Sequence, residues 1–206
     1  MSAPTAPTAE DLERVAARAI EEVRDGMRLG LGTGRAAEAF IVRLGARVRE
    51  GLEVVGVATS ERSEALARQV GVKTTSLASV DSLDVAFDGA DEVAPDLSLV
   101  KGLGGAHLRE RVVAREAGRF VVLVTPEKLV KQLGERAPIP IEVVPFAVGP
   151  AQRRLARLAP VTGVSRRMVK GENVPFVTDN GNAILDAAIT PTDRPAEVDA
   201  AFRAIA

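Results

Sequence analysis

Short apolar segments alternate with amphipathic segments along residues 11–137. Apolar runs such as 27–31 have the length of buried strands, and residues 61–70 repeat apolar positions at helical spacing. The pair Thr8 and Asp11 is typical of a helix N-terminus, so a first helix is expected to begin there. Strands that alternate with helices at this spacing predict a parallel sheet with crossover helices.

The rhythm changes after Pro138, where several strand-like segments follow with few helices between them. The pattern therefore predicts an α/β fold with an open, mostly parallel sheet and flanking helices, plus a smaller α+β subdomain inserted toward the C-terminal end. The expected boundaries are 1–10 for a flexible lead, 11–137 for the α/β domain and 138–206 for the subdomain, with a short helix at 126–134 and a strand at 174–178 among the elements.

The composition removes several kinds of chemistry from consideration. The 206 residues include no Cys and one His, which excludes disulfides, thiolate nucleophiles and the usual zinc ligand sets. Lys and Arg total 27 against 28 Asp and Glu, so no overall basic field is available to hold a nucleic acid. The N-terminus has no signal-peptide pattern and no apolar stretch has the length of a membrane span, so we expect a cytoplasmic protein without a membrane partner.

Three loops follow apolar strands, which is where open parallel sheets bind ligands. The first is Gly30-Leu31-Gly32-Thr33-Gly34. Glycine lets backbone N–H groups approach an anion at a helix N-terminus, so this loop is a candidate phosphate cradle. A dinucleotide fingerprint does not fit, because its third glycine would fall at Arg35 and no carboxylate follows the next strand. A tight turn that merely requires glycine is the alternative, and the sequence leaves both open.

The second loop contains three carboxylates, Asp88, Asp91 and Glu92, after an apolar strand. Carboxylates at one strand end repel one another, so their grouping predicts a cation site or an acid–base pair rather than a solvated turn. Mg²⁺ often uses only one or two carboxylates together with substrate oxygens, so a metal site stays open at this point.

The third loop runs from Lys101 through three glycines to Glu110. It places one cation, Lys101, and one anion, Glu110, around a single concavity. A purely structural role for Glu110 does not explain why Lys101 and the glycines occur together. Glu110 near a helix start could also simply complement the helix dipole. His107 is the one histidine of the chain, and without a partner motif we interpret it as a loop or packing residue.

Five motifs stand in a fixed order along the chain, and together they resemble the type A ribose-5-phosphate isomerases. The resemblance extends through PIPIEVVPF and VTDNGNAILD, so it covers most of the sequence. The five motifs are GLGTG at 30–34, ATSERS at 58–63, DGADEV at 88–93, KGLGGAHLRE at 101–110 and PEKLVKQLG at 126–134.

The resemblance implies an enzyme that interconverts ribose 5-phosphate and ribulose 5-phosphate in the non-oxidative pentose phosphate pathway, as a cytoplasmic homodimer without metal or organic cofactor. By position, it implies that Glu110 is the base that moves a proton between C1 and C2 through a cis-enediol(ate). It further implies that Asp88, Asp91 and Lys101 contact the sugar oxygens and assist ring opening and enediolate stabilisation. The substrate-binding residues that it implies are Thr33, Gly34, Arg35, Ala36, Asp88, Gly89, Ala90, Asp91, Lys101, Gly102, Leu103, Gly104 and Lys128.

The sequence departs from the family pattern at the phosphate end. The family usually reads G-T-G-S-T where this chain has Gly32-Thr33-Gly34-Arg35-Ala36, and its lysine in the first helix falls near Leu12. We therefore predict that Arg35 replaces both the two lost hydroxyl groups and the lysine as the phosphate ligand, because a guanidinium at a helix N-terminus can bind phosphate bidentately. Relatives also continue with a segment that begins near Pro-Gly-Val-Val and returns as a strand, which this sequence does not contain.

Two other functions remain open on the sequence. A non-catalytic sensor module of the same fold would keep the phosphate loop, but it has no need for Glu110, Asp88, Asp91 and Lys101 as a set. The second alternative is a metal-dependent sugar-phosphate enzyme whose metal site is built from Asp88 and Asp91. Full turnover in EDTA would exclude this alternative.

Overall fold

A computed structural model describes residues 6–205, which form two compact units. The first unit comprises the chain up to Ala90 together with Ala106–Lys128, and the second comprises Asp91–Gly105 together with the chain from Leu129 onward. The chain therefore passes between the units at three places. Residues 1–5 of the expected flexible lead lie outside the described residues.

The first helix, α1 (Ala9–Ile20), begins as Thr8 and Asp11 predict. The Thr8 side chain accepts a hydrogen bond from the Asp11 backbone N–H, and the Asp11 carboxylate accepts one from the Thr8 backbone N–H at 3.0 Å. The hydrogen bonds from Thr8 lower the pKa of Asp11 from 3.8 to about 2. Because the folded-state pKa is depressed, this part of the cap is complete above pH 3.8 and is lost as the pH falls through about 2.

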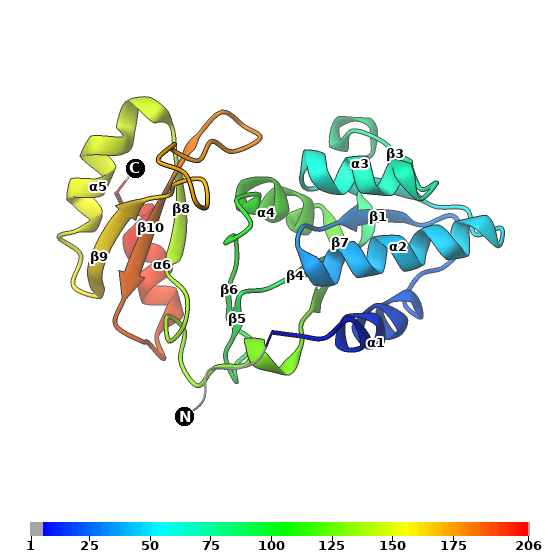
Figure 1. Cartoon of the computed structure of the whole chain (residues 1–206), viewed down its shortest axis with the longest axis horizontal. Coiled ribbons are helices and arrows are strands. Elements are labelled where there is room, and N and C mark those ends of the chain that lie inside the picture. The colour runs from blue at the N-terminus through cyan, green and yellow to red at the C-terminus, as the bar shows by residue number, and fades with distance from the viewer. Residues whose placement is uncertain (1–5, 206) are drawn as a thin grey trace. The chain divides into compact units, whose positions relative to one another are not determined.

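A five-stranded parallel sheet forms the centre of the first unit and confirms the predicted α/β fold (Figure 1). The strand order is β3-β2-β1-β4-β7. Because every pair is parallel, the carboxyl ends of all five strands lie at one edge of the sheet. The strands are β1 (Arg28–Leu31), β2 (Val55–Ala58), β3 (Lys73–Thr74), β4 (Leu83–Gly89) and β7 (Ala117–Leu123).

Helices cover both faces of this sheet. On one face, side chains of α1 and α2 pack against Leu29 and Leu31, and the rings of Phe40 and Phe87 stack with centroids 4.2 Å apart. On the other face, Val113 of α4 packs in a separate cluster. Burial of side chains of this size stabilises the fold by roughly 1.5–3 kcal/mol each. The remaining helices of this unit are α2 (Arg35–Arg49), α3 (Glu61–Gln69) and α4 (His107–Arg115), with 3₁₀ turns η1 (Leu77–Ser79) and η2 (Pro126–Lys128).

The second unit contains a three-stranded antiparallel sheet in the order β8-β10-β9 and a separate two-stranded hairpin, β5-β6. Side chains of α5 and α6 pack with the three-stranded sheet around Leu155 and Leu185, both fully buried. The elements are β5 (Glu92–Val93), β6 (Leu99–Val100), β8 (Ile139–Val143), η3 (Pro145–Ala147), α5 (Val148–Leu155), β9 (Val161–Arg166), β10 (Ala183–Ile189) and α6 (Pro195–Arg203).

The short helix expected at 126–134 is wrong beyond its first turn. Only Pro126–Lys128 is helical, as the 3₁₀ turn η2. Afterwards the backbone hydrogen bonds go to distant partners: the N–H of Val130 donates to the carbonyl of Val93, and the N–H of Leu133 donates to the carbonyl of Thr192. These tertiary bonds replace the i→i−4 bonds that a helix would need.

The strand expected at 174–178 is also wrong. This segment makes one isolated bridge, between Met168 and Pro175, and the N–H of Phe176 donates to the carbonyl of Arg167. The N–H of Arg167 donates instead to the carbonyl of Ile184, so this N–H does not pair with Phe176 and the pairing stops at the bridge.

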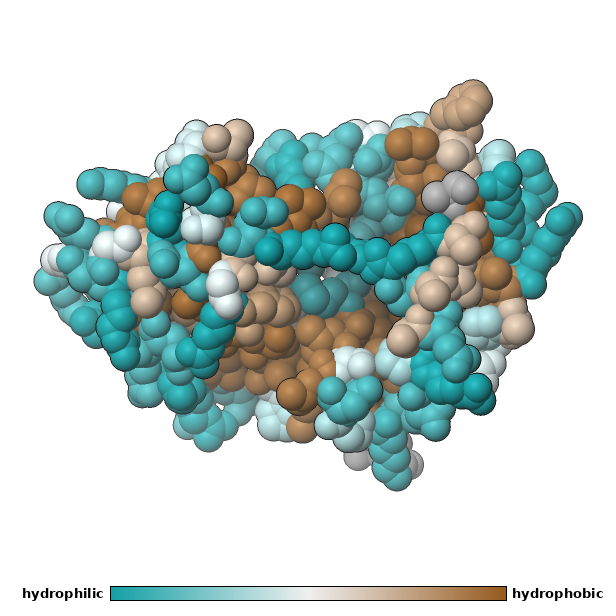
Figure 2. Space-filling view, turned by 180° about the vertical axis from the view of Figure 1, so that it is seen from behind, coloured by the Kyte–Doolittle hydropathy of each residue, from teal (hydrophilic) through white to brown (hydrophobic). Residues whose placement is uncertain are grey.

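Hydrophilic side chains cover much of the face seen in Figure 2, and hydrophobic side chains are also exposed on it. Among the described residues, the large exposed hydrophobic side chains include Leu97, Val144 and Phe146. Every helix within residues 6–205 is too short or too polar to cross a membrane.

Candidate functional site

Gly30, inside β1, lets α4 lie close to the sheet. A Cβ at this position would lie 2.6 Å from the Cβ of Ala86 and 2.7 Å from Cγ1 of Val113 on α4. Glu110 precedes Val113 by one turn of the same helix, and its residue surface is 4% exposed. The glycine therefore serves packing, and it helps to place a buried carboxylate on the first turn of α4.

Gly32, directly after β1, lets the loop approach Asp88 at the end of β4. A Cβ at Gly32 would lie 2.3 Å from Oδ1 of Asp88, so no other residue fits here without displacement. The backbone N–H groups of Thr33 and Gly89 donate to that Oδ1 at 3.0 and 2.8 Å. Asp88 is 3% exposed, and these two hydrogen bonds join the loop after β1 to the loop after β4.

A cluster of four hydroxyl groups supports the loop after β1. Oγ1 of Thr33 lies 2.8 Å from the hydroxyl oxygens of both Thr59 and Ser60. The Ser63 hydroxyl donates to the carbonyl of Gly32 at 2.7 Å. Thr59, Ser60 and Ser63 are buried, so the cluster fixes the position of Thr33. Our site prediction omitted these three residues, although the ATSERS motif at 58–63 was the signal that could have found them.

The N-terminus of α2 follows this loop. Gly34 has φ 106°, a conformation that favours glycine, and it turns the chain into the helix. Arg35 is the first residue of α2 and is exposed, whereas Ala36 is partly buried. Within the described residues, the Arg35 guanidinium has neither a hydrogen bond nor an ion pair. The free N–H groups and dipole of a 15-residue helix favour an anion at this end, where the guanidinium adds a full positive charge.

Lys128 lies beyond the carboxyl end of β7, the neighbour of β4 in the sheet. It is partly buried, and its backbone N–H donates to the carbonyl of Thr125 at 2.9 Å. The first unit therefore gathers Thr33, Asp88 and Gly89 by hydrogen bonds, with Lys128 following the adjacent strand.

Ala90 is buried at the end of the first segment of the first unit, and the remaining predicted site residues belong to the second unit, around the β5-β6 hairpin. Oδ2 of Asp91 accepts a hydrogen bond from the backbone N–H of Leu103 at 2.9 Å. Asp91 also pairs through its backbone N–H with the carbonyl of Val100, directly before Lys101. Gly102 has φ 97°, so the loop that follows β6 needs glycine there. The structure thus brings Asp91 together with the glycine loop that carries Lys101, Gly102, Leu103 and Gly104.

Glu92, the third carboxylate of the acidic motif, has a different role from its neighbours. It is fully buried, and its two oxygens accept hydrogen bonds from the backbone N–H groups of Gly134, Arg136 and Ala137 at 2.6, 2.6 and 2.9 Å. The expected grouping of three carboxylates is therefore wrong, because Glu92 is occupied in holding a loop. In the described part of the chain, no three His, Cys, Asp or Glu side chains gather as they would around a metal ion.

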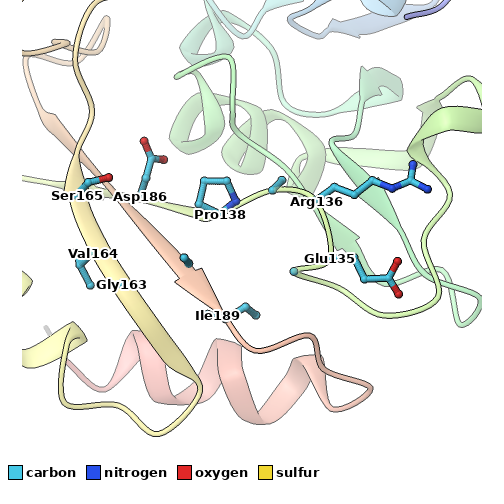
Figure 3. Close-up of a pocket in the computed structure, with 11 residues that line it drawn as sticks. Glu135, Arg136, Pro138, Gly163, Val164, Ser165, Asp186 and Ile189 are labelled. Atoms are coloured by element: carbon cyan, nitrogen blue, oxygen red, sulfur yellow. The ribbon is translucent and has the colours of Figure 1, made fainter. Parts of the chain in front are cut away.

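A pocket of about 680 Å³ lies in the second unit between this loop and strands β9 and β10 (Figure 3). In the close-up, the side chains of Glu135 and Arg136 extend from the loop away from the strands, and Asp186 projects from β10 beside Ser165 of β9. None of the predicted site residues lines this pocket.

The chain is similar to known proteins over most of its length. Residues 55–206 match the family model described as ribose 5-phosphate isomerase A (phosphoriboisomerase A). The chain is 50% identical to ribose-5-phosphate isomerase A of Nitrobacter hamburgensis over 184 residues, covering 87% of this chain and 79% of that protein. It is 48% identical to the protein of the same name from Methanothermobacter thermautotrophicus over 191 residues, covering 92% of this chain and 83% of that one.

Solved structures give the same result. Ribose 5-phosphate isomerase A from Methanocaldococcus jannaschii aligns with a TM-score of 0.88 and 41% identity, covering 95% of this chain and 87% of that chain. A D-ribose-5-phosphate isomerase in complex with phospho-erythronic acid aligns with a TM-score of 0.89 and 38% identity, covering 95% of this chain and 85% of that chain.

Proposed function

The chain belongs to the ribose 5-phosphate isomerase A family and interconverts ribose 5-phosphate and ribulose 5-phosphate, and we propose that Glu110 is the base that carries the proton in this reaction. The observation that supports Glu110 most directly is its burial, at 4% exposed, on the first turn of the helix that Gly30 seats on the sheet. A carboxylate is a competent base for the acidic proton next to a carbonyl group. Its burial limits the access of water that would compete for that proton.

The proposed reaction conserves all atoms. In the open-chain aldose, Glu110 takes the proton from C2, and the electron pair moves to give a cis-enediolate. The proton then returns from the Glu110 carboxyl group to C1, while a hydroxyl proton shifts from O2 to O1, and the ketose forms. No oxidant, reductant or cofactor is consumed. The reaction therefore needs none of the cysteine chemistry that this sequence, which has no Cys, excludes.

Asp88, Asp91 and Lys101 are proposed to act on the sugar oxygens. A buried carboxylate whose Oδ1 is already fixed by two backbone N–H groups, as in Asp88, can present Oδ2 to a sugar hydroxyl during ring opening. Lys101 would stabilise the negative charge that develops on the enediolate oxygen. The roles of Asp91 and Lys101 rest on their positions in the family motifs.

The phosphate group is proposed to bind at the N-terminus of α2. Thr33, Gly34, Arg35 and Ala36 supply backbone N–H groups and one guanidinium there, and Lys128 supplies a second cation. Backbone groups of Gly89, Ala90 and of Gly102, Leu103 and Gly104 are proposed to line the rest of the substrate site.

Arg35→Ser is expected to raise the KM for ribose 5-phosphate about tenfold with a smaller change in kcat. The substitution removes a charge-assisted hydrogen bond to phosphate, which contributes roughly 1.5–3 kcal/mol. Steady-state kinetics measures this directly. Arg47→Ser, at the other end of α2 in an exposed ion pair with Glu50, is the matched control and should leave KM unchanged. A KM that is unchanged or lower in Arg35→Ser would show that Arg35 does not bind the phosphate group.

Incubation of the protein with ribose 5-phosphate, followed by detection of ribulose 5-phosphate, tests the proposed function. Conversion is expected, and it should persist in full after treatment with EDTA. Loss of turnover in EDTA would support a metal-dependent mechanism instead. Binding of phospho-erythronic acid without any conversion would support the non-catalytic sensor module.

We also propose a cytoplasmic homodimer that acts in the non-oxidative pentose phosphate pathway. This proposal follows from membership of the family, and light scattering coupled to size-exclusion chromatography measures the oligomeric state.

A further inference from the structure

The glycine loop after β6 is held from two sides within the second unit. On one side, Oδ2 of Asp91 accepts the backbone N–H of Leu103 at 2.9 Å. On the other side, Nη1 of Arg167 donates to the carbonyl of Leu103 at 2.8 Å and to the carbonyl of Gly102 at 3.3 Å. The Asp91 carboxylate therefore binds one backbone N–H of the loop, and the Arg167 guanidinium binds two of its carbonyl oxygens. The charge of each side chain strengthens these hydrogen bonds.

Arg167 is itself fixed in orientation. Its Nε donates to Oδ2 of Asp186 on β10 at 2.9 Å, and its Nη2 contacts Oδ1 of the same carboxylate. The two side chains are 12% and 16% exposed, so this is a largely buried, bidentate ion pair. The backbone N–H of Arg167 also donates to the carbonyl of Ile184 at 2.9 Å. With Nε and Nη2 engaged by Asp186, Nη1 is directed at the loop.

We propose that Arg167 is a positioning residue for the isomerisation, because it orders the loop that carries Lys101 and Gly102–Gly104 before the sugar arrives. The proposal rests on the proposed function of this loop. A glycine-rich segment loses much conformational entropy when it becomes ordered, so a loop that is already held binds substrate at a lower cost. Lys101 lies one residue before the clamped carbonyl of Gly102, so a shift of the loop also moves the cation away from the enediolate oxygen.

Lysine cannot replace Arg167 in this role. The planar guanidinium contacts both Asp186 oxygens and two carbonyls at once, whereas an ammonium group is a single centre that cannot bridge these positions. The arrangement therefore predicts that a positive charge at position 167 is not sufficient to hold the loop. A lysine there would keep the charge but lose the contacts, so it distinguishes a positioning role from a general electrostatic effect.

The test compares Arg167→Met and Arg167→Lys with the parent in turnover of ribose 5-phosphate. Both variants are expected to lower kcat/KM by about ten- to hundredfold, through a higher KM and a lower kcat together. Hydrogen exchange of the peptide that contains the Leu103 amide should become faster in both, while exchange in β10 stays parent-like. Arg166→Met is the matched control, because Arg166 is the adjacent arginine and its side chain is exposed.

The outcomes separate the clamp from simple structural support. A parent-like kcat/KM in Arg167→Met would overturn the proposal, and so would full rescue by Arg167→Lys. If Arg167→Met does not fold, Asp186→Asn provides the second variant, and unchanged exchange at Leu103 in it contradicts the clamp. If the parent itself converts no ribose 5-phosphate, the proposed function fails, and the exchange measurement still decides whether Arg167 orders the loop.

Discussion

Glu110→Gln is expected to lower kcat for ribose 5-phosphate by about 10²–10⁴-fold, with little change in KM. Glutamine keeps the size of the side chain and one acceptor oxygen, but its amide group cannot take a proton from C2. The conversion assay measures the loss. A second readout follows the chemistry itself: with ribose 5-phosphate deuterated at C2, the parent should transfer deuterium to C1 of the product, and the variant should not.

Glu116→Gln is the matched control for this prediction. Glu116 caps the C-terminal end of the same helix and is exposed, so neutralising it removes an equal charge from α4 without touching the buried position. It should retain parent-like turnover and parent-like transfer of deuterium from C2 to C1. If Glu110→Gln is fully active, Glu110 is not the base, and the other carboxylates of the first unit would have to be tested in its place.

Asp88→Asn is expected to lower kcat/KM by about 10²–10³-fold while the protein stays folded. The amide oxygen of asparagine can still accept the N–H groups of Thr33 and Gly89, so the two loops remain joined. The other carboxylate oxygen, however, becomes an NH₂ group, which can neither accept a sugar hydroxyl nor take up its proton. Kinetics measures the activity, and thermal unfolding measures whether the fold is preserved.

Asp96→Asn provides the comparison, because Asp96 also accepts a backbone N–H and is exposed. Its two oxygens accept the backbone N–H and the hydroxyl of Ser98 at 3.0 and 2.9 Å, and these bonds lower its pKa. The variant should retain parent-like kcat/KM. Equal losses of activity in both variants would mean that the effect of Asp88→Asn arises from folding rather than from the sugar site.

The sequence was informative where the signal is local. The cap at Thr8 and the parallel strands follow from spacing over a few residues, and the loops at strand ends follow from the geometry of such sheets. The roles of Glu92 and Arg167 were not predictable in this way. Glu92 binds amides 42 to 45 residues away, and Arg167 binds a carbonyl 65 residues away. Such contacts depend on how the whole second unit folds, which periodicity does not report.

The glycines at 30–34 show the same limit of prediction from local sequence patterns. The sequence left the loop at 30–34 open between a phosphate cradle and a tight turn. In the structure, Gly30 is required for helix packing, Gly32 for the approach to Asp88 and Gly34 for the positive φ before α2. Each reason depends on a different neighbour, so the spacing of the three glycines could not distinguish them.

The threefold passage of the chain between the units has a consequence for synthesis on the ribosome. A nascent chain that has emerged only to Lys128 contains the complete parallel sheet, but its hairpin β5-β6 still lacks the partners that follow Leu129. Until Gly134, Arg136 and Ala137 emerge, the carboxylate of Glu92 has none of the three amides that bind it in the finished protein. The hairpin, with Asp91 and Lys101 at its ends, therefore acquires its native support late, after the sheet that flanks it in sequence can already fold.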